Sequence, residues 1–246
     1  GDDGTVWGAE FLVADLLGYR RVASLLPAPM PGGDLASRTP WRAALGYLSL
    51  DPGLEGVFAS AFEGVDEREL AVARRQIERR LNAPLASSMG RLFDAAAAIL
   101  GIRRRATYEG QAAMELEALA GRRPAAEHPV RFVEGRDRLL IDPLPLLATL
   151  GARKRRGEDP ADLAADFHAS IAWACAEMTR RTAREAGLDT VVLGGGSFQN
   201  ARLLESMTGR LEYSGFRVLV PCRLPPNDGA VSYGQAAVAA ARLAAE

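Results

Sequence analysis

The segment LGGGSFQNARLL, from Leu193 to Leu204, places three glycines between an apolar run and a sequence that is typical of a helix. The run DTVVL before the glycines predicts a strand, and SFQNARLLESMTGRL predicts a helix. The pattern then repeats, because FRVLVP predicts a second strand, PPNDG a turn and AVSYGQAAVAAARLAAE a final helix. This strand–helix–strand–helix order is typical of a parallel α/β unit.

The glycine turn is a candidate ligand site, because ligands of open α/β sheets bind beyond the carboxyl ends of the strands. Gly194, Gly195 and Gly196 have no side chain to keep a phosphate or a ribose from the backbone. The N–H groups at the start of the following helix favour an anion, and Asn200 is placed to hydrogen-bond a base, sugar or phosphate. The alternative is a tight turn whose glycines only let strand and helix pack closely.

The PPNDG turn is expected at the same edge of the sheet, because it follows the next strand. Asn227 and Asp228 would then lie beside the glycine turn. A carboxylate at this position is suited to a metal ion or a metal–nucleotide complex. The alternative is that Asp228 is the N-cap of the last helix.

Most of the chain before this unit is predicted to be helical, after two strands in TVWGAEFLV and YRRVASLLP. The predicted helices start at Thr39–Pro40, at Asp66 with Glu69 as a capping box, at Ser88, at Glu109 and at Asp159–Pro160. The second of these has Leu70, Ala73, Ile77 and Leu81 on one stripe, and the last ends near Gly187. VRFVEGRDRLLID predicts a small hairpin, and ARKRRGED a solvated basic loop or, alternatively, a phosphate- or partner-binding segment.

The composition is that of an ordinary globular protein, with 246 residues, 48% apolar residues and a net charge of −1. The charge gives no indication of nucleic-acid binding, and no apolar run is long enough to span a bilayer. Only Cys175 and Cys222 are present, which indicates a reducing compartment, the cytoplasm. Cys175 is expected to be a small core residue.

Taken together, these segments resemble the hydrogenase-maturation carbamoyltransferases of the HypF type. The resemblance rests on VVLGGGSFQNARLL, PPNDGAVSYGQ, GDDGTVWGAEFL, PGGDLASRTPWR, TYEGQAAMELEAL and, most specifically, NAPLASSMGRLFDA. It implies an α/β fold, namely an RNase H-like lobe of the actin and sugar-kinase superfamily with a mainly helical insertion. Antibiotic O-carbamoyltransferases and tRNA threonylcarbamoyl transferases are more distantly similar.

The resemblance implies that carbamoyl-adenylate, formed by the full protein from ATP and carbamoyl phosphate, is held between two lobes. The carbamoyl group then passes to the C-terminal cysteine of a partner protein in nickel–iron hydrogenase maturation. No side chain of the enzyme acts as a nucleophile in this reaction. The alternatives are transfer to the hydroxyl group of a small molecule, and a truncated lobe that only binds a nucleotide or a partner.

The same resemblance implies roles for individual residues. Gly195, Gly196 and Asn200 match the family's nucleotide loop, and Asp228 matches its metal-binding aspartate. Asp94, Gly110 and Glu115 match nucleotide and ribose contacts of the tRNA-modifying relatives, although the proline–glycine pattern around Gly110 is replaced. The alternatives are a solvated Asp94 within its helix and a surface position for Glu115.

One departure from the family concerns the metal, iron or zinc, which two histidines hold upstream of the GDDG segment. This chain has only His128 and His168, which belong to no paired motif and are interpreted as structural. We therefore expect Asp228 to be the chain's one metal ligand, with the histidine ligands outside it. We also expect that the chain alone does not transfer carbamoyl groups.

The predicted organisation has residues 1–38 and 160–246 in the nucleotide-binding lobe and residues 39–159 in the insertion. In the superfamily the lobe begins with a central strand, and TVWGAEFL resembles the strand that comes second. We therefore expect the chain to be part of a longer polypeptide. An upstream segment of that polypeptide would fill a slot between Thr5–Leu12 and Thr190–Leu193.

Overall fold

A four-stranded sheet joins the beginning and the middle of the chain in this computed structural model, which describes residues 1–245. Strand β1 (Glu10–Ala14) pairs antiparallel with β2 (Tyr19–Leu25), and β6 (Leu139–Asp142) lies parallel to β2. The outer strand β5 (Arg131–Glu134) pairs antiparallel with β6. The predicted hairpin is therefore confirmed, and its strand β6 joins it to β1 and β2 in one sheet.

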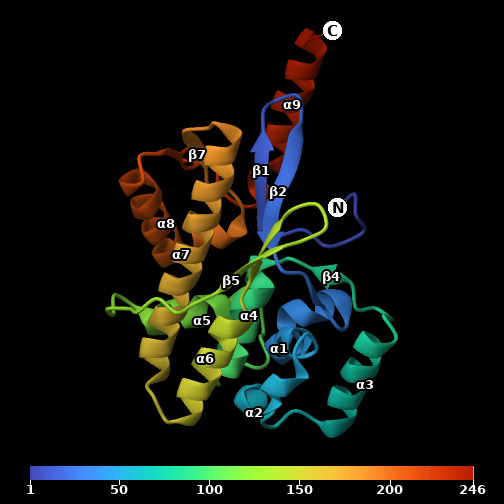
Figure 1. The fold of residues 1–246 in the computed structure, drawn as a ribbon. Helices are drawn as coiled ribbons and strands as arrows, with labels where there is room; N and C mark the ends of the chain where they lie inside the picture. Colours follow the sequence, from blue (N-terminus) through green and yellow to red (C-terminus); the bar gives the residue numbers. More distant parts are fainter. Residues whose placement is uncertain (246) are drawn as a thin grey trace.

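The long helix α7 (Pro160–Ala186) packs against β1, β2 and β6 and links the sheet to the C-terminal unit (Figure 1). Its start and end follow the predicted signals. The Asp159 carboxylate accepts a hydrogen bond from the Ala161 N–H at 2.9 Å, and Gly187 closes the helix with a left-handed φ of 68°. Cys175 is buried in this helix, as expected, and burial raises the pKa of its thiol to about 12.

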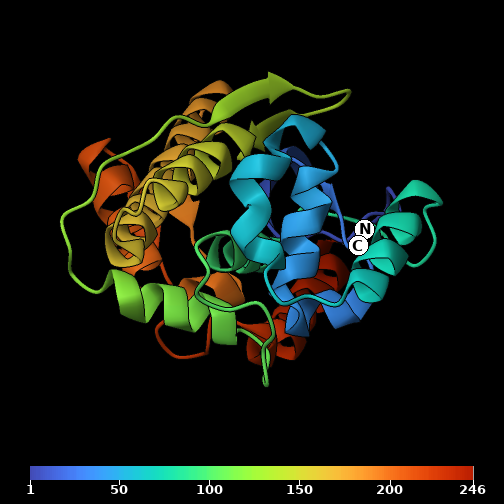
Figure 2. The ribbon, with the colours of Figure 1, turned by 90° about the horizontal axis from the view of Figure 1, so that it is seen from below.

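Below the sheet lies a group of short helices, seen from below in Figure 2, which together with α7 supply most of the main core. They are α1 (Pro40–Leu48), α2 (Glu55–Phe58), α3 (Glu67–Glu78), α4 (Met89–Ile99), α5 (Gln111–Ala120) and α6 (Leu144–Arg155), with 3₁₀ turns at Gly33–Arg38, Pro52–Leu54 and Ala59–Phe62. A small antiparallel pair, β3 (Ala28–Pro29) and β4 (Leu85–Ala86), lies beside them. Trp41, Tyr47, Phe58 and Phe167 are among the largest fully buried side chains.

Two of the predicted helix starts in this region are confirmed by capping hydrogen bonds, whereas Thr39 makes none and α5 begins at Gln111. Asp66 accepts hydrogen bonds from the N–H groups of Arg68 and Glu69, and Ser88 accepts one from Arg91. The capping box is only half formed, because the Glu69 side chain pairs with Arg105. Leu81 was wrongly assigned to the apolar stripe of α3, since the helix ends before it and the side chain is 66% exposed.

The interpretation of ARKRRGED as a loop was also wrong, because its first four residues are the last turn of α6. Leu146, Leu147 and Leu150 are fully buried and hold this helix in the core. The basic residues at its end lie where the negative end of the helix dipole favours cations.

The C-terminal unit has the predicted parallel arrangement. Strand β7 (Thr190–Val192) pairs parallel with β8 (Arg217–Leu219), and helix α8 (Ala201–Tyr213) connects them. The last helix, α9 (Val231–Ala245), extends beyond the ends of β1 and β2, and none of its residues is buried (Figure 1). None of the helices in residues 1–245 is long and apolar enough to cross a membrane.

Within residues 1–245, β1 and β7 are not paired with each other. A cavity of about 470 Å³ lies between them and is lined by both strands, α7 and the glycine turn. The two free strand edges therefore face a common space. That an upstream segment fills this space stays a prediction.

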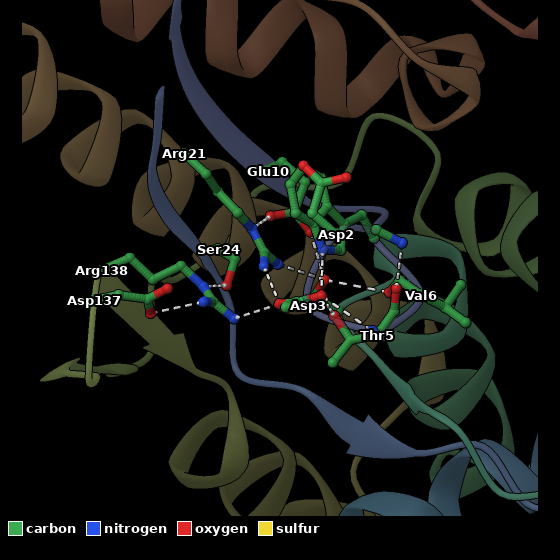
Figure 3. Close-up of polar contacts among 12 residues, drawn as sticks. Asp2, Asp3, Thr5, Val6, Glu10, Arg21, Ser24, Asp137 and Arg138 are labelled. Carbon is green, nitrogen blue, oxygen red and sulfur yellow. Dashed lines mark hydrogen bonds and ion pairs between the residues drawn. The ribbon is translucent and has the colours of Figure 1, made fainter. Parts of the chain in front are cut away.

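A polar network fixes the N-terminal turn to the sheet and to the start of α4 (Figure 3). Asp3 accepts a hydrogen bond from the Trp7 indole N–H at 2.8 Å and pairs with Arg21 at 2.7 Å. Arg21 also donates to Glu10 at 2.5 Å, and its guanidinium lies 4.2 Å from the centre of the Trp7 ring. Glu10 accepts from the Ser87 hydroxyl. The network therefore ties β1 and β2 to Ser87, in the segment between β4 and α4.

Candidate functional site

The two predicted turns lie side by side at the carboxyl ends of β7 and β8. The Gly195 N–H donates to the Pro226 carbonyl at 2.7 Å, which joins the glycine turn directly to the PPNDG turn. Gly195 has a φ of 105° and a ψ of 156°, a conformation that is essentially restricted to glycine. The prediction that parallel neighbouring strands bring these turns together is confirmed.

Asn200 lies at the start of α8 and is held by two contacts. Its Oδ1 accepts a hydrogen bond from the Leu203 N–H at 2.8 Å, so it is the N-cap of the helix. Its Nδ2 lies 3.0 Å from Nε2 of His168. Nδ1 of His168 lies 2.7 Å from the Ala164 carbonyl, to which it donates, which leaves Nε2 as the acceptor for Asn200.

His168 has the structural role that the sequence indicated. The ring is 1% exposed and packs edge-on against Phe93 and Phe167. Burial lowers the pKa of His168 to about 4, because a charged imidazolium loses its hydration there. The neutral ring thereby connects α7 to the first turn of α8.

The N–H groups at the start of α8 are already bonded. Ala201 donates to the Glu117 carboxylate at 2.8 Å, and Arg202 donates to the same oxygen at 3.4 Å. In contrast, no hydrogen bond among residues 1–245 uses the N–H groups of Gly194, Gly196 or Ser197. The amides available to a ligand are therefore those of the exposed glycine turn and not those of the helix after it.

Asp94 is buried in α4, next to Phe93, and is not the solvated residue of the alternative reading. Its Oδ2 lies 2.8 Å from Nη2 of Arg91, but that oxygen and the Arg91 Nε both lack a hydrogen bond within residues 1–245. Burial raises the pKa of Asp94 to about 7, which Arg91 opposes and Glu109 reinforces. Oδ2 of Asp94 therefore has an ion-pair partner but no hydrogen bond within residues 1–245, and it is shielded from solvent.

The remaining predicted contacts lie at the start of α5. Gly110 precedes the helix with a left-handed φ of 78°. Glu115 is partly buried and forms a two-pronged ion pair with Arg103, at 2.7 and 2.5 Å, and accepts from Gln111 at 3.0 Å. The hydrogen bonds from Arg103 lower the pKa of Glu115, so this carboxylate is ionised and already oriented.

Asp228 is exposed in the PPNDG turn and does not cap the last helix, because it begins the 3₁₀ turn Asp228–Ala230 that leads into α9, and Asn227 is the N-cap of that turn. Asn227 accepts a hydrogen bond from the Gly229 N–H at 3.1 Å. No group of three or more His, Cys, Asp and Glu side chains in residues 1–245 is placed to hold a metal. His168 is engaged with Asn200, and His128 contacts Asp166 and Arg153. The described residues therefore do not make a metal site by themselves.

Sequence reasoning did not identify Glu117, Arg202 and His168 as neighbours of the site. Their partners are distant in the chain, and no local pattern signals such contacts. The elements that carry the predicted residues are nevertheless connected, because Phe93 contacts His168, His168 contacts Asn200, and Glu117 contacts the start of α8. The cavity beside the glycine turn is lined by Gly194, Gly195, Gly196 and Ser197, and its lining does not include Asp94, Gly110, Glu115 or Asp228.

Comparison with known proteins identifies close relatives. Residues 1–235 match the family model of the carbamoyltransferase Kae1-like domain, second subdomain. The carbamoyltransferase HypF of Rhodobacter capsulatus is 44% identical over 99% of the chain, and HypF2 of Cupriavidus necator is 38% identical over 98%. The crystal structure of full-length HypF in the phosphate- and nucleotide-bound form is 39% identical over 97% of the chain, with a TM-score of 0.91. The chain spans 31–32% of the length of these three relatives.

Proposed function

Because the chain belongs to the HypF carbamoyltransferase family, we propose that it holds carbamoyl-adenylate for transfer of the carbamoyl group to a cysteine of a hydrogenase-maturation protein. The observation that supports this proposal most directly is the pair of adjoining turns after β7 and β8. The unbonded N–H groups of Gly194, Gly196 and Ser197 suit an adenylate phosphate, which is an anion.

We assign the ribose to the carboxyl groups of Asp94 on α4 and Glu115 on α5. Glu115 is ionised and oriented by Arg103, and its Oε2, which accepts only the Arg103 Nε–H, can accept one ribose hydroxyl without rearrangement. Asp94 has one buried oxygen without a hydrogen bond, and a ligand hydroxyl would satisfy it. A site with such buried polar groups selects strongly for a ligand that carries the matching hydroxyls.

In the proposed reaction the cysteine thiolate of the acceptor attacks the carbonyl carbon of carbamoyl-adenylate. A C–S bond forms, the bond between that carbon and the phosphate oxygen breaks, and AMP leaves with the electron pair. The chain's contribution is positioning, because the carbonyl is already activated. ATP and carbamoyl phosphate would be the substrates of the whole protein, which acts in the cytoplasm. Asp228 is assigned one coordination position of a divalent metal, iron or zinc, and no reaction step is attributed to that metal.

The experiment that tests this function uses the intact protein with ATP, carbamoyl phosphate and an acceptor protein that ends in cysteine. We expect the acceptor to gain the mass of one carbamoyl group, and an acceptor whose terminal cysteine is replaced by alanine to gain none. Carbamoylation of small hydroxyl compounds, with no transfer to the cysteine, would contradict the proposed acceptor.

A further inference from the structure

Helices α5 and α8 hold each other's ends through charged side chains. The Glu117 carboxylate, from α5, accepts the N–H groups of Ala201 and Arg202 at the start of α8. The Arg202 guanidinium, from α8, donates to the carbonyls of Gly121 and Arg123 just after α5, the second at 2.8 Å. We call this pair of contacts the α5–α8 clamp.

In both contacts of the clamp, the charge of the side chain is opposite to the partial charge of the helix end that it contacts. The start of a helix carries a partial positive charge and its end a partial negative charge, and the clamp places a carboxylate at the first and a guanidinium at the second. With Asn200 as the N-cap, the first three N–H groups of α8 are satisfied. The clamp thus bonds backbone groups at two helix ends, whereas Arg210 and Glu127, at the other end of α8, form an ion pair between side chains at the surface.

The clamp joins two helices that each carry or follow a predicted site residue. Glu117 is two residues from Glu115 on α5, and Arg202 is two residues from Asn200 at the end of the glycine turn. Both helices pack against α7, but α5 lies in the predicted insertion and α8 in the C-terminal unit (Figure 1). A direct tie between them fixes the spacing between the carboxylate that would bind the ribose and the amides that would bind the phosphate.

We propose that Glu117 and Arg202 are positioning residues, which hold the ribose side and the phosphate side of the site at the spacing that an adenylate requires. The proposal rests on the proposed function, since it takes these two sides as the adenylate site. Neither residue is assigned a contact with the ligand. The proposal predicts that loss of either contact weakens adenylate binding by more free energy than it removes from the free energy of unfolding.

The test is carried out in the intact protein with AMP as the probe. Protection of the peptide Leu193–Asn200 from hydrogen exchange is followed as AMP is added, so that binding is measured at this turn alone. We expect Glu117→Ala and Arg202→Ala to raise the midpoint of the AMP titration about tenfold. The midpoint of the double variant should be little higher than that of the single variant with the higher midpoint, because both contacts set the same spacing. Glu117→Gln keeps an acceptor oxygen and should stay within about threefold of the unmodified protein.

The matched control is Glu127→Ala, which removes a charged partner of α8 away from the site and should leave the midpoint unchanged. Unchanged midpoints in Glu117→Ala and Arg202→Ala would overturn the clamp, and so would a Glu117→Gln variant as weak as Glu117→Ala. If Glu117→Ala does not fold, Arg202→Ala and Glu117→Gln decide the question. If AMP gives no protection in the unmodified protein, it is the proposed function that fails.

Discussion

Replacement of Asn200 by alanine is the perturbation whose effect the structure defines most fully. The change removes the cap of α8, because Oδ1 no longer accepts the Leu203 N–H at 2.8 Å. It also removes the donor that faces Nε2 of His168 at 3.0 Å. That ring is 1% exposed, so water does not readily replace the lost donor.

The two losses can be given magnitudes. Loss of an N-cap costs about 1 kcal/mol, and an unsatisfied buried acceptor costs about 1–3 kcal/mol. Asn200→Ala should therefore destabilise the start of α8 by about 2–4 kcal/mol. Asn200→Ser keeps a capping oxygen but does not reach His168, so it isolates the second contribution.

Native-state hydrogen exchange of the intact protein measures this effect locally. Amides of α8 in Asn200→Ala should lose roughly 30- to 700-fold in protection, the equivalent of 2–4 kcal/mol. Helix α3 (Glu67–Glu78) serves as the internal reference and should not change. If α8 keeps its protection in Asn200→Ala, the cap and the His168 contact do not hold this helix, and the reasoning fails.

Three further predictions follow from the site. Gly195→Ala should destabilise the glycine turn by about 1–3 kcal/mol because of the φ of 105°. Gly194→Ala should be tolerated, because no atom lies within 4 Å of the added methyl group. Urea titrations compare the free energies of unfolding of the two variants. The folded-state pKa of His168, about 4, lies below its unfolded value of 6.5, so its contribution to stability is complete above pH 6.5 and declines by about 3 kcal/mol as the pH falls to 4. Asp94 acts in the opposite direction, because its raised pKa of about 7 makes folding less favourable as the pH rises from about 4 to 7. In denaturant unfolding measured against pH, His168→Gln should remove the loss of stability toward low pH, and Asp94→Asn should remove the loss of stability between about pH 4 and 7. Identical pH profiles for the two variants would contradict both assignments. Asp228→Asn should change stability by less than about 0.5 kcal/mol, because Asn227 provides the cap and Asp228 is exposed, while carbamoyl transfer by the intact protein should fall; unchanged transfer would remove Asp228 from the site.

The elements with strong local signals were predictable from the sequence. Helix α7 begins at Pro160 after its Asp159 cap and ends before Gly187, as the capping rules indicate. Helix α6 was missed, because LPLLATLG has little helical periodicity and the basic residues after it are typical of a loop. Its stability comes from burial of Leu146, Leu147 and Leu150, which is decided by the tertiary structure.

The sequence predicted where in the fold the site lies, but it did not predict which residues contact one another there. Parallel strands place their following turns at one edge, so Gly195 and Pro226 were expected to be close, and they are hydrogen-bonded. The partners of Asn200 and Ala201, His168 and Glu117, are 32 and 84 residues away in the chain. No periodicity or cap signal encodes such pairs. For the same reason the sequence did not reveal that the N–H groups of α8 are already bonded.

The central claim is that the glycine turn binds the adenylate phosphate, and a crystal structure of the intact protein with AMP tests it most directly. We predict a phosphate oxygen about 3 Å from the amide nitrogens of Gly196 or Ser197, with a ribose hydroxyl bonded to Glu115 or Asp94. AMP bound only at another part of the protein, with the turn between β7 and α8 unoccupied at saturating AMP, would contradict the claim.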